Sequence, residues 1–213
     1  MRFSTAHNSP THTQICELRD YPEWHCGRKR YGLWAIPVGC PAVLARMQAA
    51  RELLGDWLHP GYLRQAHITL FVCGFEALQR RYDDDFCSDQ LQRQREDLQR
   101  LPLAPFELQI GRLDSFSSAA FLQVDDPQRR LQPLRDCLTG HAEEIRQSPY
   151  LPHLTLGLYR QSISAQAWRE RAAALSQPQP LHFTVHELHY CTYQADQLFG
   201  PLRYDTCVPL AIA

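Results

Sequence analysis

The alternation of apolar and polar residues is most regular in two short stretches that carry the same pattern. Residues 66–70 read Ala-His-Ile-Thr-Leu, and residues 152–156 read Pro-His-Leu-Thr-Leu. Because successive side chains of a strand point to opposite faces, the histidine and threonine of each stretch share one face and the aliphatic residues share the other. A polar pair on an apolar strand needs a function or hydrogen-bond partners, since its desolvation is costly. Two such pairs predict one shared site.

The segments around these stretches also repeat. Apolar periodicity and Pro/Gly breaks predict a first series with strands near 33–36, 67–75 and 106–110, and helices near 41–58 and 88–101. A second series has strands near 121–124, at the His153 stretch and near 183–190, with helices that begin at Pro127 and near residue 164. Three pairs of positions are each 86 residues apart, namely Ile36 and Leu122, Pro41 and Pro127, and His67 and His153.

This constant spacing of 86 residues indicates an internal duplication, and its period is too long for a solenoid. We predict an α+β fold with repeat units at about 31–115 and 117–213, which together form a single bilobal domain. Two antiparallel-rich sheets would face a central cleft, with the helices on the outside. Residues 1–30 show no sustained period, and we interpret them as an N-terminal arm or extension. The basic Arg28-Lys29-Arg30 run in this arm is either a solvated cluster or an edge that contacts phosphate.

Composition narrows the setting of the protein. The 213 residues are 44% hydrophobic, which is enough for a core, and the net charge of −1 creates no global field that attracts nucleic acid or a membrane. No run approaches the ~18 apolar residues of a membrane span, and the polar N-terminus lacks the core of a secretion signal. The eight cysteines are scattered without a CxxC pair. We therefore expect free thiols, a cytoplasmic location and a monomer that binds no membrane.

The paired histidines suggest acid–base chemistry. Two imidazoles with unperturbed pKa values near ~6.5 coexist at neutral pH as one base and one acid. An in-line displacement at phosphorus needs a base on the nucleophile and an acid on the leaving oxygen, on opposite sides of the phosphate. His67 and His153, related by a two-fold axis, would supply both positions. The hydroxyls of Thr69 and Thr155 would then hydrogen-bond the non-bridging oxygens between them.

At these residues the chain resembles the two-histidine phosphoesterase superfamily, especially its bacterial 2′,5′ RNA ligase and RNA cyclic-phosphodiesterase branch. That family is defined by two His-x-Thr/Ser-x motifs, with x apolar, in a bilobal duplicated fold. Both motifs match here in full, and the duplication extends the resemblance over about residues 31–213. The resemblance implies a hydrolase without metal or cofactor that opens 2′,3′-cyclic phosphates, or cleaves or forms 2′,5′ bonds. Its substrates would be RNA ends or small cyclic nucleotides, with His67 as proton donor and His153 as proton acceptor.

The chain departs from this family pattern at one position. Many relatives that act on RNA carry a basic residue five positions after the second histidine, where this chain has Leu158. Arg160 lies two residues further on and has the same strand parity as Leu158. The departure bears on RNA-end specificity rather than on the two-histidine chemistry.

The alternation of side chains along the two motif strands predicts further residues in the cleft. Phe71 shares the face of His67 and Thr69, and Tyr159 shares the face of His153 and Thr155. Aromatic rings there either stack a base, which is worth ~1–3 kcal/mol, or close the cleft by ordinary packing. The resemblance adds Tyr204, and more weakly Arg203, from the last hairpin of the family.

Three other interpretations compete with this one. His182 and His186 would share a strand face about 13 Å apart and His189 would face the other way, so we predict no metal site from this cluster. The second is that His67 and His153 are core histidines whose hydrogen bonds go to the backbone. A single histidine of this kind is common, but two at equivalent positions of a duplication, each followed by a threonine, are not. The third is a non-catalytic module that binds RNA or nucleotides in the same cleft. Two titratable histidines favour an enzyme, because binding alone needs Arg or Lys more.

Overall fold

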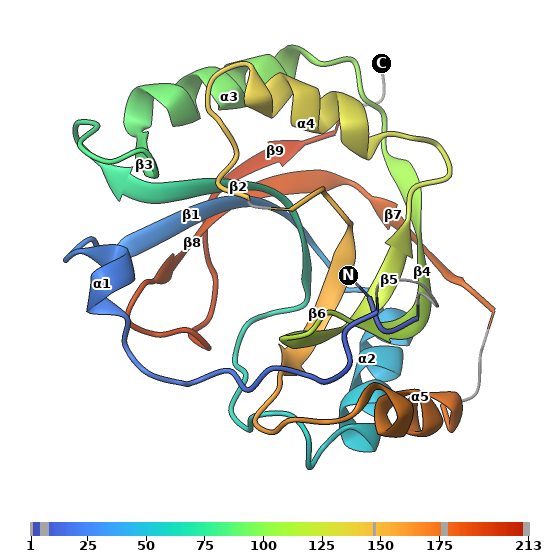
Figure 1. The fold of residues 1–213 in the computed structure, drawn as a ribbon. Coiled ribbons are helices and arrows are strands. Elements are labelled where there is room, and N and C mark those ends of the chain that lie inside the picture. Colours follow the sequence, from blue (N-terminus) through green and yellow to red (C-terminus); the bar gives the residue numbers. More distant parts are fainter. Residues whose placement is uncertain (1, 5–8, 147, 176–178, 211–213) are drawn as a thin grey trace.

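The computed structural model describes residues 2–4, 9–146, 148–175 and 179–210, and its central feature is one nine-stranded sheet (Figure 1). The strands are β1 (Arg30–Pro37), β2 (His67–Ala77), β3 (Asp85–Cys87), β4 (Phe106–Ser115), β5 (Ala119–Asp125), β6 (His153–Leu158), β7 (Leu181–Val185), β8 (Glu187–Gln194) and β9 (Arg203–Pro209). The helices of these residues are α1 (Pro22–His25), α2 (Pro41–Leu53), α3 (Ser88–Arg100), α4 (Leu131–Thr139) and α5 (Ala165–Ala173).

The strands lie in the order β7-β4-β5-β6-β2-β1-β8-β9, with β3 paired to β2. All pairs are antiparallel except β2 with β3. The sequence predicted two facing sheets, and this part of the prediction needs correction because β2 and β6 pair directly, with Ile68 opposite Leu154. Hydrogen bonding between the two motif strands thus joins the expected sheets into one.

The sheet is strongly curled, and the connection between β7 and β8 shows why. The sequence predicted a single strand near 183–190, but the chain forms two strands separated only by His186. One of them lies at the end of the strand order, and the other lies six places along it. Two strands joined by one residue must be close in space, so the sheet bends round until its two parts approach each other (Figure 1).

The two repeats also exchange strands. β4, which ends the first predicted unit, pairs with β5 and β7 of the second unit. In return, β8 from the C-terminal part of the chain pairs with β1. The halves of the sheet therefore do not coincide with the halves of the chain, although both motif strands lie at its centre.

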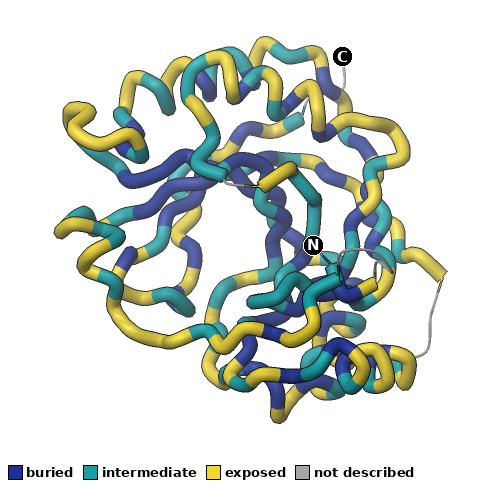
Figure 2. Tube along the Cα trace, in the orientation of Figure 1, coloured by how far each residue is buried: buried dark blue, intermediate teal, exposed yellow. Residues whose placement is uncertain are grey.

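One face of the sheet packs against the helices through the main apolar core. The largest core cluster joins one face to the helices, with Trp34 from β1, Met47 from α2, Leu134 from α4 and Trp168 from α5. We call this the helix face, and α3 and α4 lie side by side along part of it (Figure 1). Buried positions concentrate in the central strands (Figure 2). We call the opposite face, which carries His67, the site face.

Helix starts follow local chemistry. Pro41 occupies the first turn of α2, where its missing N–H is no loss. The equivalent Pro127 was predicted to begin a helix, but α4 begins four residues later at Leu131, whose N–H donates to Asp126 Oδ2 at 2.7 Å. An acceptor on Asp126 fixes the start there, so the two repeats differ at this point.

The cysteines and the helix lengths bear on what composition predicted. All eight cysteines are free thiols, as expected. No helix in the described ranges has the length and apolar character that crossing a membrane requires.

Candidate active site

The two motifs meet at the centre of the sheet on adjacent antiparallel strands. Ile68 lies opposite Leu154, and these residues occupy equivalent positions of the duplication, 86 residues apart. A local two-fold axis therefore passes between them. Antiparallel pairing then sets His67 beside Thr155, and Thr69 beside His153, all on the site face. Side chains paired in this way have Cβ atoms about 4.5–5.5 Å apart, so each histidine adjoins the threonine of the other motif.

Both imidazoles are held by the same backbone contact. His67 Nδ1 donates to the carbonyl of Gln65 at 2.7 Å, and His153 Nδ1 donates to the carbonyl of Leu151 at 2.7 Å. A carbonyl only accepts, so each neutral ring carries its proton on Nδ1. Nε2 is then the unprotonated nitrogen of both rings, and it is the atom available to exchange a proton with a ligand.

Burial shifts both histidines toward the neutral form. The residue His67 is 9% exposed, and desolvation lowers its pKa to about 4, against the opposing effect of the Gln65 carbonyl. Desolvation also lowers the pKa of His153, again opposed by a backbone hydrogen bond and aided by the charge of Arg146. The charge of Arg64 likewise lowers the pKa of His67. An anionic phosphate would favour the imidazolium form and so oppose these shifts.

Each motif strand contains a bulge directly after its threonine. In β2, Thr69 lies opposite Ala35 whereas Phe71 lies opposite Trp34, so Leu70 is an extra residue. A bulge of this kind reverses the faces of the side chains that follow it, until the next register shift of the strand. Phe71 was predicted on the site face from simple alternation, but the bulge puts it on the helix face with Trp34, where it is fully buried.

The second motif repeats this feature at the equivalent position. Thr155 lies opposite Phe121 and Gly157 lies opposite Ala120, which makes Leu156 the extra residue. The prediction for Tyr159 is corrected for the same reason, because Tyr159 packs on the helix face with no exposed surface. Its hydroxyl accepts from Trp168 Nε1 at 2.7 Å and is 2.6 Å from Ser115 Oγ. Neither aromatic ring presents a free face to a base.

Two arginines hold the bulges in place. Arg51 of α2 donates from Nε to the carbonyl of Leu156 at 2.9 Å, and Arg135 of α4 donates from Nη1 to the carbonyl of Leu70 at 2.5 Å. Each repeat thus supplies the helix that fixes the motif strand of the other. Glu144 completes the second contact, because it pairs with Arg135 at 2.6 Å and accepts from the backbone N–H of the residue that follows Phe71.

The same bulge decides the orientation of the residue that departs from the family pattern. Leu158 lies opposite Ala119, on the site face with His153 and Thr155. An apolar side chain therefore stands on the site face at this position. Arg160 does not replace it, since Arg160 is exposed and donates from Nε to the carbonyl of Asp56 at 2.8 Å.

Sequence reasoning missed the aromatic residues that do contact His153. The ring centroids of Phe116 and Phe121 lie 5.0 Å and 5.3 Å from that of His153, both edge-on. Phe116 lies between β4 and β5, and no motif marked it. A pocket of about 640 Å³ is lined by His153, Phe116, Arg146 and residues of the N-terminal arm, including His12 and Gln14. The arm was predicted only as an extension, and it forms one wall beside the second histidine.

The last nominated residues lie further along the same face. Tyr204 is 37% exposed and lies opposite Cys191, on the site face. Its ring packs edge-on against His189, with centroids 5.1 Å apart. Arg203 forms an ion pair with Asp205 at 2.8 Å. Three strand spacings separate β9 from β2, so Tyr204 belongs to the rim of the site rather than to its centre.

The family model of the 2′-5′ RNA ligase superfamily matches residues 40–197, a range that contains both motifs. The chain belongs to the 2′-5′ RNA ligase superfamily. The fold agrees with solved members of this two-histidine phosphoesterase group. No curated protein matches the sequence.

Three solved structures illustrate the likeness of fold to the superfamily. Escherichia coli LigT complexed with 3′-AMP is 18% identical, with a TM-score of 0.54 over 85% of this chain and 98% of LigT. LigT complexed with NADP+ is 18% identical, with a TM-score of 0.53 over 85% of this chain and 98% of LigT. Kluyveromyces marxianus Usb1 is 14% identical, with a TM-score of 0.54 over 84% of this chain and 98% of Usb1. At these identities the agreement concerns the fold.

Proposed function

We propose that the protein is a metal-independent phosphodiesterase that opens 2′,3′-cyclic phosphates, or cleaves or forms 2′,5′ bonds, at RNA ends or in nucleotides. The observation that carries this proposal is the pairing of Ile68 with Leu154, because it sets each histidine beside the threonine of the other motif. A phosphate between the strands would meet two hydroxyl donors and an imidazole Nε2 on either side. This is the arrangement that an in-line displacement requires.

The two histidines take different roles in this reaction. Following the superfamily, we assign His67 as the acid that protonates the leaving oxygen and His153 as the base that takes a proton from the attacking water. Both imidazoles are neutral without ligand, so the acid must be protonated when the anionic substrate binds. Substrate affinity should therefore rise as pH falls, and the rate should follow a bell-shaped pH profile that belongs to the coupled pair.

The surroundings of His153 bear on the substrate class. The pocket next to this ring is lined by Phe116 and Arg146, and an aromatic ring and a guanidinium suit a base and a phosphate respectively. LigT has been solved with 3′-AMP, NADP+ and ATP, so nucleotides fit this fold. Leu158 is uncharged, so the site face lacks the cation that the family resemblance leads us to expect at this position. We infer that this chain favours a short RNA end or a nucleotide over a long RNA backbone.

The test uses a short RNA that ends in a 2′,3′-cyclic phosphate, incubated with enzyme in excess EDTA. Wild type is compared with His67→Ala, His153→Ala and a matched control, His182→Ala, which changes an exposed histidine. Circular dichroism checks that each variant is folded, and chromatography resolves 2′- from 3′-phosphate products. We expect turnover in wild type and in His182→Ala, and loss of turnover in the two motif variants.

Binding of the same RNA, measured in parallel by fluorescence anisotropy, separates the alternatives. RNA that is bound but never opened would favour the non-catalytic binding module and overturn the proposed reaction. Turnover that persists in either motif variant would overturn the assignment of the acid and the base. The absence of both binding and turnover would remove RNA ends from the substrate class.

A further inference from the structure

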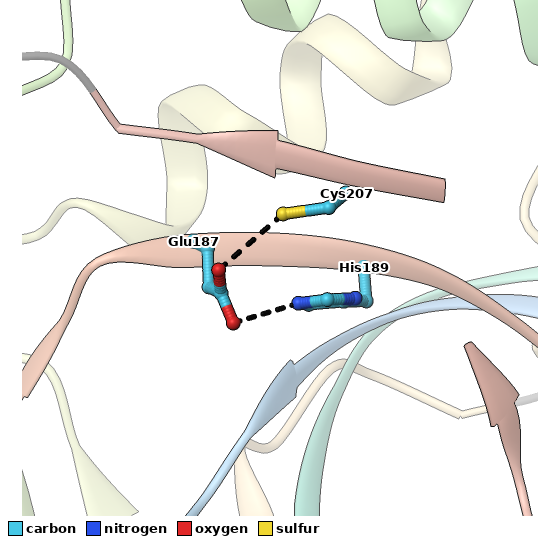
Figure 3. Close-up of side chains that lie close together, drawn as sticks. All are labelled: Glu187, His189 and Cys207. Carbon is cyan, nitrogen blue, oxygen red and sulfur yellow. Dashed lines mark hydrogen bonds and ion pairs between the residues drawn. The ribbon is translucent and has the colours of Figure 1, made fainter. Parts of the chain in front are cut away.

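A second cluster of chemically active side chains lies on the site face, away from the two motifs. Glu187 and His189 come from β8 and Cys207 comes from β9, and the three side chains point toward one another (Figure 3). His189 Nε2 lies 2.8 Å from Glu187 Oε1, and Cys207 Sγ donates to Glu187 Oε2 at 3.4 Å. One carboxylate thus holds an imidazole and a thiol at the same time.

Strand register explains how these residues meet. Glu187 and His189 are two apart on β8 and so share a face, and Cys207 lies directly opposite His189 on β9. The histidine spacing along β8 gave no indication of this cluster, because two of its three members are not histidines and one lies on another strand. The cluster is open to solvent on one side, where Cys207 is exposed and the carboxylate of Glu187 is 47% exposed.

We propose that Glu187, His189 and Cys207 bind a divalent transition metal ion, with Zn²⁺ as the best fit. Nitrogen and sulfur ligands select such ions over Mg²⁺ and Ca²⁺, which prefer oxygen. The donor atoms already lie within 4.8 Å of one another. Ligands of tetrahedral zinc are about 3.3–3.6 Å apart, given Zn–N and Zn–S distances near ~2.0 and ~2.3 Å, so small side-chain rotations complete the site.

Charge supports the same ligand. The cluster supplies one carboxylate and, once its proton leaves to solvent, one thiolate, whose two negative charges neutralise a divalent ion. The imidazole adds a neutral donor. Water occupies the fourth position on the exposed side, as in zinc sites with three protein ligands.

The location of the cluster separates it from the proposed reaction. Thr69, Ala35, His189 and Cys207 form one row across four neighbouring strands. At about 4.8 Å between strands, His189 is about 10 Å from Thr69, too far for the ion to touch a phosphate held by the motifs. The ion would instead tie β9, which lies at the end of the strand order, to β8. Turnover in EDTA is therefore expected with or without this site.

The test is a titration of the full-length, metal-free protein with Co²⁺, followed by Zn²⁺. We expect one Co²⁺ per chain with a thiolate-to-cobalt charge-transfer band, and displacement of the Co²⁺ by Zn²⁺. Cys207→Ser should remove the band and lower the Zn²⁺ affinity by more than about 100-fold in a chelator competition. Cys26→Ser, which changes another exposed thiol, is the matched control and should leave both unchanged.

Glu187→Gln provides a second variant that keeps the size of the side chain, in case the cysteine variant does not fold. It should weaken Zn²⁺ binding, while His182→Ala, which changes an exposed histidine, should not. A wild-type protein without the charge-transfer band would overturn the proposal. So would a band that survives in Cys207→Ser or disappears in Cys26→Ser. None of these readouts depends on catalytic activity, so the outcome is independent of the proposed function.

Discussion

The buried imidazole of His67 makes the stability of the fold depend on pH in a defined window. Its pKa is about 4 in the folded protein, because desolvation disfavours the charged ring, and near ~6.5 in an unfolded chain. Between these values the unfolded state binds more protons, so the free energy of unfolding falls as pH decreases. Integrating over the two pKa values gives a loss of about 2 kcal/mol by pH 5 and about 3 kcal/mol by pH 4.

The assay is urea denaturation of wild type and His67→Asn at pH 7 and at pH 5. Asparagine keeps a side-chain donor for the Gln65 carbonyl but does not titrate. Other titrating groups are present in both proteins, so the difference between the two unfolding free energies isolates His67. We expect this difference to move by about 2 kcal/mol in favour of the variant on going from pH 7 to pH 5. A difference that stays constant would refute the burial argument for His67.

Three further predictions follow from the site. Leu158→Lys restores a cation on the site face and should tighten RNA binding more at low salt than at high salt, as measured by anisotropy; equal affinities would contradict its orientation. Arg135→Met removes the donor to the Leu70 carbonyl and one of the two arginines that pair with Glu144, so the free energy of unfolding should fall by about 2 kcal/mol in urea titrations, against no change for the exposed control Arg93→Met. Affinity for 3′-AMP, measured by calorimetry, should increase as pH falls from 8 to 6; the opposite slope would contradict neutral imidazoles in the free protein.

Much of the site could be predicted because the motif strands carry strong local patterns. Alternation fixed the shared face of each His-Thr pair, and the spacing of 86 residues predicted their equivalence. The structure adds that the two equivalent positions, Ile68 and Leu154, lie opposite each other. An arrangement with a local two-fold axis follows naturally from a duplicated sequence.

The errors come from features that have no local sequence pattern. The bulges at Leu70 and Leu156 occupy ordinary aliphatic positions, and they reverse the faces of Phe71 and Tyr159. The exchange of β4 and β8 between repeats depends on long-range pairing that periodicity cannot report. Phe116 was missed for a similar reason, since its contact with His153 depends on how β5 and β6 pair.

The central claim is that His67 and His153 act as one acid–base unit. The most direct test is the single-turnover rate constant for opening a 2′,3′-cyclic phosphate, measured for wild type, the two alanine variants and the double variant. We predict that each single substitution lowers the rate constant by ~10²–10⁴-fold and that the double variant is hardly slower than either single one. A single variant with the wild-type rate constant, or losses that multiply fully in the double variant, would contradict the claim.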